Sequence, residues 1–245
     1  APKSHQPLTG MEQSTYLTFD EMRMHPELVA RSSVSKKGGT TRFVGSTVPE
    51  FALEFFPLEG PLLECGPLRG DFTNFLQTHG YQNIHTVDFI DLIEYADRDR
   101  VTVSTLDLSM EKFPYPDNFF IGAAAWGLGE HLENPFHFVR EVARVLKPGA
   151  VFIFSLPNVF HILSRLVFLK RGIFPRWSYV NNHISILPRG VFDKTVLRDF
   201  DLIETRYVKP QLMLWFLNRF ARWLPANQWF GDYVVYILKK RDRPL

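Results

Sequence analysis

Two acidic residues and two glycines in the first half of the chain are spaced in a way that suits a nucleotide-containing ligand. Glu64 lies near the end of an apolar run, Gly66 and Gly70 follow in a turn, and Asp88 comes 22 positions after Gly66. Glycines let the backbone turn tightly and approach a ligand closely, and a helix that starts after such a turn offers unpaired N–H groups. An acid about 20 residues further on can hold a ribose hydroxyl. An ordinary strand-to-helix turn is the alternative interpretation.

The elements that must position these residues alternate between strands and helices from residue 50 onward. Apolar runs predict buried strands over 61–65, 83–87, 101–106, 119–126 and 150–156, and two further strands over 201–208 and 233–239. Helices are expected over 50–56, 71–80, 91–96, 135–146 and 188–200. Buried strands separated by helices indicate an α/β fold with a parallel sheet covered on both faces, and ligands of such sheets lie at the carboxyl ends of the strands.

We therefore expect one Rossmann-like domain over residues 50–245, with a seven-stranded, mostly parallel sheet and helices on both faces. An insertion near 158–187 interrupts the pattern, and an aromatic helix is expected over 211–224. Residues 1–49 are expected to form an N-terminal arm with a helix over 18–31, which could close over the site as a lid.

Glu64, Gly66 and Gly70 resemble motif I of the class I S-adenosylmethionine-dependent methyltransferases, of the type 11 and type 23 kind. The likeness continues in order to about residue 160. Its later segments are FPYPDNFF at 113–120, WGLGEHL at 126–132, FVREVARVLKPGA at 138–150 and SLPN at 155–158. The resemblance implies a Rossmann-like fold, S-adenosylmethionine as cofactor, and methyl transfer as the activity.

The resemblance also implies which residues contact the cofactor. By this likeness the methionine end is held by the first turn, the ribose by Asp88, and the adenine side by Asp107 with Leu108 flanking the ring. The implied contacts are Glu64, Gly66, Pro67, Gly70, Asp88, Phe89, Asp107, Leu108 and Trp126.

Two positions depart from the family pattern. Leu68 stands where the family has its middle glycine, and Ile121 stands where it usually carries an aspartate. These departures motivate an alternative function, a binding or scaffold protein that keeps the fold without catalysis. A nicotinamide-dependent oxidoreductase is disfavoured because the chain has no G-x-G-x-x-G.

Two histidines are candidates for catalysis. Methyl transfer from an activated sulfonium needs alignment and exclusion of water, and it needs a base only when the acceptor is protonated as it attacks. His131 follows the fourth strand and His183 follows the insertion; either could act as the base or orient the acceptor. A loop-stabilising role is the alternative for both. A base of this kind favours a hydroxyl acceptor, although N- or C-methylation stays open.

No metal is predicted, because the sequence has no H-x-x-x-H and no second cysteine beside Cys65.

The bulk composition limits the partners. A net charge of +2 gives no electrostatic case for nucleic acid. One cysteine excludes an intrachain disulfide and suits a reducing compartment, so a cytoplasmic location is expected. The segments 159–174 and 211–224 combine apolar and basic residues. They favour a small or lipid-linked acceptor, and leave peripheral membrane contact, a homodimer face and internal packing as alternatives.

Overall fold

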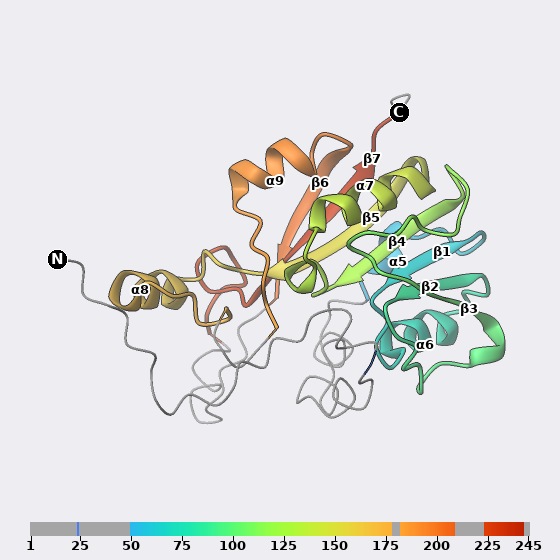
Figure 1. Cartoon of the computed structure of the whole chain (residues 1–245), viewed down its shortest axis with the longest axis horizontal. Coiled ribbons are helices and arrows are strands. Elements are labelled where there is room, and N and C mark those ends of the chain that lie inside the picture. Colours follow the sequence, from blue (N-terminus) through green and yellow to red (C-terminus); the bar gives the residue numbers. More distant parts are fainter. Residues whose placement is uncertain (1–23, 25–49, 178–181, 209–222, 243–245) are drawn as a thin grey trace.

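The computed structural model describes Met24 and residues 50–177, 182–208 and 223–242, which are coloured in Figure 1. The expected arm over 1–49, apart from Met24, lies outside the described residues, and so does the expected aromatic helix before Trp223. Their assignment stays a prediction.

A seven-stranded sheet organises the described chain. Its order is β3-β2-β1-β4-β5-β7-β6, and β7 pairs antiparallel with both β5 and β6, whereas the other neighbours are parallel. The strands are β1 Leu62–Cys65, β2 Ile84–Asp88, β3 Val101–Thr105, β4 Phe120–Trp126, β5 Leu146–Pro157, β6 Phe200–Tyr207 and β7 Tyr233–Lys240. The expected Rossmann-like, mostly parallel sheet is confirmed.

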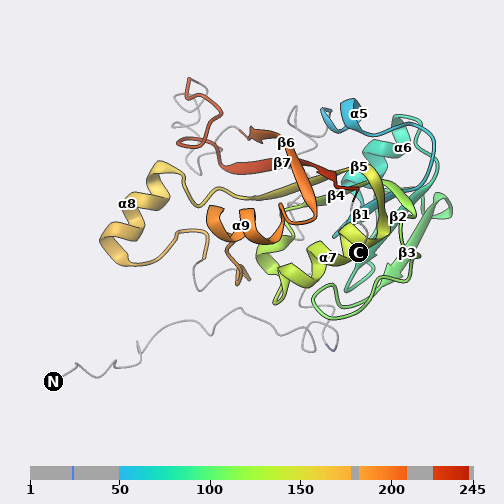
Figure 2. The same cartoon turned by 90° about the horizontal axis from the view of Figure 1, so that it is seen from above.

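Helices cover both faces of this sheet, as Figure 2 shows from above. The helices of the described residues are α5 Ala52–Phe55, α6 Asp71–Thr78, α7 Pro135–Val145, α8 Ile162–Arg171 and α9 Arg189–Thr195, with short 3₁₀ turns η1 Arg98–Arg100 and η2 Gly129–His131. All but α8 pack on the sheet. Helices α7 and α9 contribute Phe138 and Phe192 to one apolar core, and α5 and α6 contribute Ala52 and Phe72 to the other. Strands buried on both faces explain why their sequences are apolar throughout.

The strands that follow β1 in the sequence are added on one side of it as far as β3, and β4 is then added on its other side. Cys65 pairs with Val87 of β2 on one side and with Ala125 of β4 on the other. The carboxyl ends of these strands therefore lie at one edge of the sheet, and loops leaving this point diverge to opposite sides. A crevice for ligands forms at such a switch point.

The helix expected over 91–96 is wrong. The Asp91 carboxylate accepts the Ile93 N–H and forms an ion pair with Arg98, and the N–H groups of Glu94 and Tyr95 both donate to the Arg69 carbonyl at 3.0 and 2.9 Å. Backbone groups that a helix would bond internally are thus used to hold the turn after β1. Sequence periodicity carries no information about such a tertiary contact.

The helix expected over 135–146 ends earlier, at Val145. Leu146 already pairs with Phe120 of β4, so β5 begins there rather than at Ala150. Pro148 and Gly149 lie within β5, two residues after it begins. They therefore do not end the helix, because the chain is already paired as a strand at Leu146.

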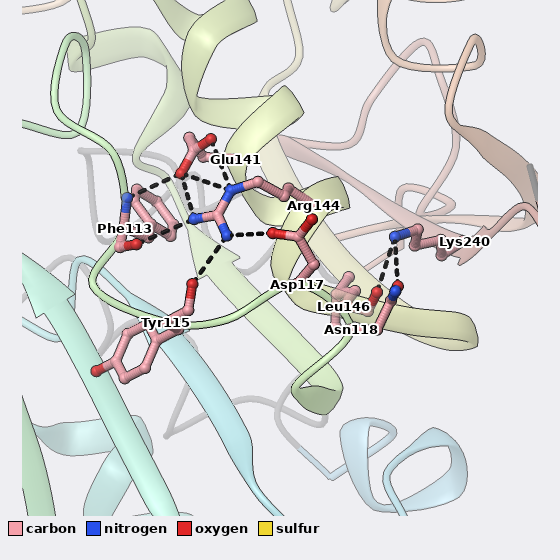
Figure 3. A network of polar contacts seen from close by, with 8 residues as sticks. All are labelled: Phe113, Tyr115, Asp117, Asn118, Glu141, Arg144, Leu146 and Lys240. Carbon is pink, nitrogen blue, oxygen red and sulfur yellow. Dashed lines mark hydrogen bonds and ion pairs between the residues drawn. The ribbon is translucent and has the colours of Figure 1, made fainter. Parts of the chain in front are cut away.

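A buried arginine fastens α7 to the segment that leads into β4 (Figure 3). Arg144 donates to the carbonyl oxygens of Phe113 and Tyr115 at 3.0 and 2.8 Å, to Asp117 at 2.8 Å and to Glu141 at 2.7 Å. Glu141 in turn accepts the Phe113 N–H at 2.8 Å. The planar guanidinium satisfies carbonyls that no strand partner reaches, so the entry to β4 is held in place.

Helix α8 projects from the body of the domain, at the left of Figure 1. None of its residues is buried; Leu163, Leu166 and Leu169 are 50%, 54% and 81% exposed. The interpretation of this segment as a core-packed helix is therefore wrong. Within the described residues, no helix combines the length and the apolar character that crossing a membrane requires.

Candidate functional site

The turn after β1 is built on three residues with positive φ. Gly66, Leu68 and Gly70 have φ of 72°, 49° and 83°, and the Gly70 N–H donates to the Pro67 carbonyl at 2.8 Å. A left-handed leucine costs about 1–2 kcal/mol, so the missing middle glycine is accommodated by strain rather than by a different turn. Leu68 therefore does not prevent the loop from closing.

Both glycines of this turn lie where a side chain has little room. A Cβ on Gly66 would lie 3.1 Å from Leu128 of the loop after β4, and one on Gly70 would lie 3.0 Å from Ile93 and 3.2 Å from Ala96. Buried Pro67 lies between them. The turn is thus packed closely between two neighbouring loops at the edge of the sheet.

Glu64 presents a carboxyl oxygen that lacks a partner. The residue is 1% exposed, and Thr73 Oγ1 of α6 donates to its Oε2 at 2.5 Å. The other oxygen, Oε1, is buried and accepts no hydrogen bond within the described part of the chain. Burial raises the pKa of this carboxyl to about 8. An orphaned buried oxygen next to a glycine turn is suited to a polar ligand group.

Asp88 ends β2 beside this turn. It is 4% exposed, and its Oδ1 accepts the Phe89 N–H at 2.7 Å. Burial raises the pKa of Asp88 to about 7, although backbone N–H groups of Phe89, Leu68 and Ile90 act in the opposite direction. The strained Leu68 thus directs its N–H at the second acidic residue of the predicted site.

Asp107 follows β3 at the same edge. Its Oδ1 accepts the Ser109 N–H at 2.7 Å and its own N–H donates to Glu111 at 2.8 Å, while the Leu106 N–H donates to the Asp88 carbonyl at 2.9 Å. One oxygen of the Asp107 carboxylate is therefore used to hold the turn that follows β3. Leu108 is a core residue, 2% exposed.

Trp126 ends β4 within the second apolar core. Its ring meets those of Phe72 and Phe51 edge-on, with centroids 5.2 and 6.1 Å away, and it is 4% exposed. The structure thus gives Trp126 a packing role, and its predicted contact with a cofactor stays a prediction, as do those of Leu108 and Phe89.

His131 and His183, which come from distant parts of the sequence, lie together. Their ring centroids are 4.6 Å apart and the rings are perpendicular. Nδ1 of His131 donates to the Asn182 carbonyl at 2.9 Å. The N–H groups of Ile184 and Ser185 donate to the Glu130 carbonyl at 2.8 and 3.0 Å, so backbone bonds bring the end of the insertion onto η2.

Glu130 is the member of this site that sequence reasoning missed. It is 1% exposed, and neither carboxyl oxygen has a hydrogen-bond partner within the described residues. Gly127, with φ of 57°, makes room for it, since a Cβ there would lie 3.2 Å from Glu130 Oε1. Burial raises the pKa of Glu130 to about 8. The only signal in the sequence was an acid placed directly before a candidate histidine.

A narrow recess adjoins this cluster at the carboxyl end of β5, with a cavity volume of about 30 Å³. Glu130 lines it, together with Phe160 and Trp177 of the insertion and Tyr207 and Tyr236 of the last two strands. Trp177 is held there by its indole N–H, which donates to the Ser185 carbonyl at 3.0 Å. The walls combine aromatic rings with polar groups, as small-molecule sites do, and the recess would have to widen to admit an acceptor.

Comparison with known proteins identifies the class. The profile of the family described as "Methyltransferase domain" matches residues 63–154, which contain the first turn, Asp88, Asp107 and the Glu130–His131 pair. Residues 63–154 thus match a methyltransferase domain, and S-adenosylmethionine is the cofactor that this match implies.

Known structures share the fold at low sequence identity. A Thermotoga maritima methyltransferase, described as a possible histamine N-methyltransferase, has 16% identity and a TM-score of 0.61; the match covers 90% of this chain and 100% of that one. An S-adenosylmethionine-dependent methyltransferase from Archaeoglobus fulgidus has 16% identity and a TM-score of 0.59, with coverages of 83% and 96%. One from Mesorhizobium loti has 15% identity and a TM-score of 0.56, with coverages of 79% and 97%.

Proposed function

We propose that this domain transfers the methyl group of S-adenosylmethionine to a hydroxyl of a small or lipid-linked acceptor, bound in the recess beside Glu130. The observation that carries the proposal is the pair of buried acids Glu64 and Asp88 at the ends of adjacent strands, beside a turn that a ligand can approach closely. Glu64 Oε1, which has no partner within the described residues, would accept from the methionine end, and Asp88 from the ribose. Asp107 would lie on the adenine side.

The chemistry then asks little of the protein beyond alignment. The cofactor, when bound, supplies a methyl group already activated as a sulfonium. His131 or His183 would accept the acceptor's proton or orient its hydroxyl, since each ring has one nitrogen that is not donating to a backbone carbonyl. Burial of the cluster keeps water out of the reaction. The recess, walled by Phe160 and Trp177, suits an acceptor with an apolar body.

The alternative, a protein that has the fold without the activity, rested on Leu68 and Ile121. Leu68 adopts the left-handed conformation that the turn needs. Ile121 donates its N–H to the Pro61 carbonyl at 3.0 Å and packs on the second core, so the change from aspartate has a packing role. Both departures are accommodated structurally, which favours the enzyme.

Calorimetric titration with S-adenosylhomocysteine, with NAD as the control ligand, tests the cofactor assignment. We expect micromolar binding of S-adenosylhomocysteine and none of NAD. A folded protein that binds neither would contradict the proposed function and favour the scaffold alternative.

His183→Ala is expected to lower the rate of methyl transfer about 100-fold or more, the range seen for a lost acid–base group, and to leave S-adenosylhomocysteine affinity unchanged. Radiolabelled S-adenosylmethionine with a panel of amphipathic hydroxyl and amine compounds provides the assay. His137→Ala is the matched control, because His137 is half-exposed and its ring donates to the Glu111 carbonyl at 2.9 Å, away from the cluster. Equal losses of rate and of cofactor affinity would show that His183 is structural, and preferred methylation of amines would overturn the hydroxyl assignment.

Helix α8 supports a lipid-linked acceptor. Its exposed leucines recur at Leu163, Leu166 and Leu169, and its ten residues include Arg165, Lys170 and Arg171 but no acidic residue. An apolar stripe flanked by cations is typical of a helix that lies in an anionic membrane interface. Because Phe160 of the recess lies just before α8, such contact would bring the recess to the lipid surface.

Serine substitutions at Leu163, Leu166 and Leu169 together are expected to weaken binding to phosphatidylglycerol-containing vesicles at least 10-fold, since each buried leucine contributes roughly 1.5–3 kcal/mol. Vesicle co-sedimentation measures this, with pure phosphatidylcholine vesicles for comparison. The paired substitutions Leu202→Ser and Ile203→Ser remove apolar side chains of similar exposure from β6 and should have no effect. Equal binding by the α8 variant and the wild type would exclude this helix as the membrane contact.

A further inference from the structure

Three potential metal-binding side chains converge beside the recess. One donor atom from each of Glu130, His131 and His183 lies within 4.8 Å of the other two. The first two residues come from η2, and the third comes from the end of the insertion. The sequence has none of the spacings that predict a metal site, so this cluster exists only through the tertiary fold.

The donor atoms of this cluster are unsatisfied. Both oxygens of Glu130 and Nδ1 of His183 are buried and without hydrogen-bond partners in the described part of the chain. Nδ1 of His131 is occupied by the Asn182 carbonyl, which leaves Nε2 with its lone pair. Buried polar atoms in proteins are nearly always paired, whereas here potential ligand atoms of three residues lie within 4.8 Å of one another.

Both imidazoles are also held in the way that metal-binding histidines usually are. His131 donates to the Asn182 carbonyl, and the ring of His183 bonds to the backbone of Arg176, which must involve Nε2 because Nδ1 has no partner. A hydrogen bond from the second ring nitrogen to a backbone carbonyl fixes the tautomer and orients the ligand nitrogen. Each ring thus presents a free lone pair to the centre of the cluster.

The charge near the cluster is compatible with a cation. Arg176 is the nearby positive side chain, and it is ion-paired with Asp232 and stacked on Tyr233 at 4.7 Å. The ion pair with Asp232 offsets part of this charge, and Arg176 still acts electrostatically on both Glu130 and His183. An ionised Glu130 would leave a divalent ion with one uncompensated positive charge, which an acceptor oxyanion would cancel.

We propose that Glu130, His131 and His183 bind one divalent transition-metal ion, of which Zn²⁺ and Mn²⁺ are the representative cases. Two imidazoles and one carboxylate suit such ions, whereas Ca²⁺ and Mg²⁺ prefer oxygen ligands alone. Metal–nitrogen bonds of about 2.0–2.1 Å require the three donors to move closer together than they lie here. The Glu130 carboxyl can make that movement, since no hydrogen bond holds it.

This inference deepens the proposed function, because the metal would lie at the wall of the recess assigned to the acceptor. The acceptor hydroxyl would bind the metal and lose its proton to water as it enters, before the cluster is closed to solvent and methyl transfer begins. The oxygen would then form a bond to the methyl carbon as the carbon–sulfur bond breaks, and the electron pair of that bond would neutralise the sulfonium. His131 and His183 would then orient the acceptor through the metal instead of taking its proton.

Titration of chelator-treated full-length protein with Zn²⁺ and with Co²⁺ tests the site without any acceptor. We expect one equivalent to bind with micromolar or tighter affinity, and the Co²⁺ protein to show the visible absorption of a nitrogen-containing site of low coordination number. Glu130→Gln and His183→Ala should each weaken binding at least 100-fold and abolish that spectrum. His79→Ala and His137→Ala, which remove an exposed and a half-exposed histidine outside the cluster, should change neither.

S-adenosylhomocysteine titration of the same variants separates failure of this inference from failure of the proposed function. Retained cofactor binding in Glu130→Gln shows that the variant is folded and that its cofactor site is intact. Tight Zn²⁺ binding that survives both Glu130→Gln and His183→Ala, or wild-type protein that binds cofactor but no Zn²⁺ or Co²⁺, would overturn the metal site. The methyltransferase proposal would stand in either case.

Discussion

Replacing Asp88 by alanine is expected to weaken S-adenosylhomocysteine binding about 100-fold or more while leaving the protein folded. Hydrogen bonds to a charged group contribute about 1.5–3 kcal/mol each, so loss of two ribose contacts removes at least about 3 kcal/mol, and each 1.4 kcal/mol is roughly a factor of ten in affinity. The fold should tolerate the change because Asp88 makes no ion pair among the described residues, and its burial opposes ionisation. Calorimetry and thermal unfolding measure the two quantities.

Asp99→Ala is the matched control for this experiment, because Asp99 is an exposed acid on η1, in the connection that follows β2. It should bind the ligand as the wild type does. Unchanged affinity in Asp88→Ala would contradict the ribose assignment, and a large loss of thermal stability would mean that the carboxylate is structural.

The same carboxyl makes binding depend on pH. Burial raises the pKa of Asp88 to about 7, so in the ligand-free protein it is largely protonated at pH 6 and largely ionised at pH 8. Because the ionised form is the better acceptor for ribose hydroxyls, affinity should rise with pH across this range. Asp88→Asn should reduce this increase in affinity with pH. The increase that remains would come from ionisation of Glu64, whose pKa is raised by burial to about 8.

Replacing Arg144 by methionine is expected to destabilise the folded protein by about 3 kcal/mol, the lower end of the range for breaking a buried ion pair. Methionine keeps the apolar stem but leaves the carbonyls of Phe113 and Tyr115 and the carboxylate of Glu141 without their donor. The guanidinium side chain is only 11% exposed, so water replaces few of these bonds. For a domain of this size the loss corresponds to a fall in Tm of roughly 6–12 °C.

Arg140→Met is the control, since Arg140 lies on the same helix and is exposed. Its effect should stay within about 0.5 kcal/mol, as for most surface substitutions. Denaturant unfolding measures both variants. A change below about 1 kcal/mol for Arg144→Met would mean that the network in Figure 3 contributes little to stability.

The sheet and the predicted cofactor residues could be placed from the sequence because both are local patterns. Strands buried on both faces read as apolar runs, and β1, β2 and β4 were found within a residue or two of their ends. Glu64 lies near the end of β1, Asp88 ends β2 and Gly66 follows β1 directly, so identifying the strands places these residues at one edge of the sheet. The segment 91–96 was misassigned because its backbone bonds to Arg69, a contact that no local pattern encodes.

The sequence by itself thus determined the fold class and the edge of the sheet where the acids lie, since hydrophobic periodicity and strand-end residues are short-range properties. Only the tertiary structure decided that Glu130 belongs to the site, that its carboxyl is buried without a described partner, and that His183 meets His131. That meeting depends on hydrogen bonds between Asn182 and His131, which lie 51 positions apart in the chain, and between the backbones of Ile184 and Glu130. Such long-range pairing is selected by the packing of the insertion on the sheet edge, and the spacing of residues along the chain carries no trace of it.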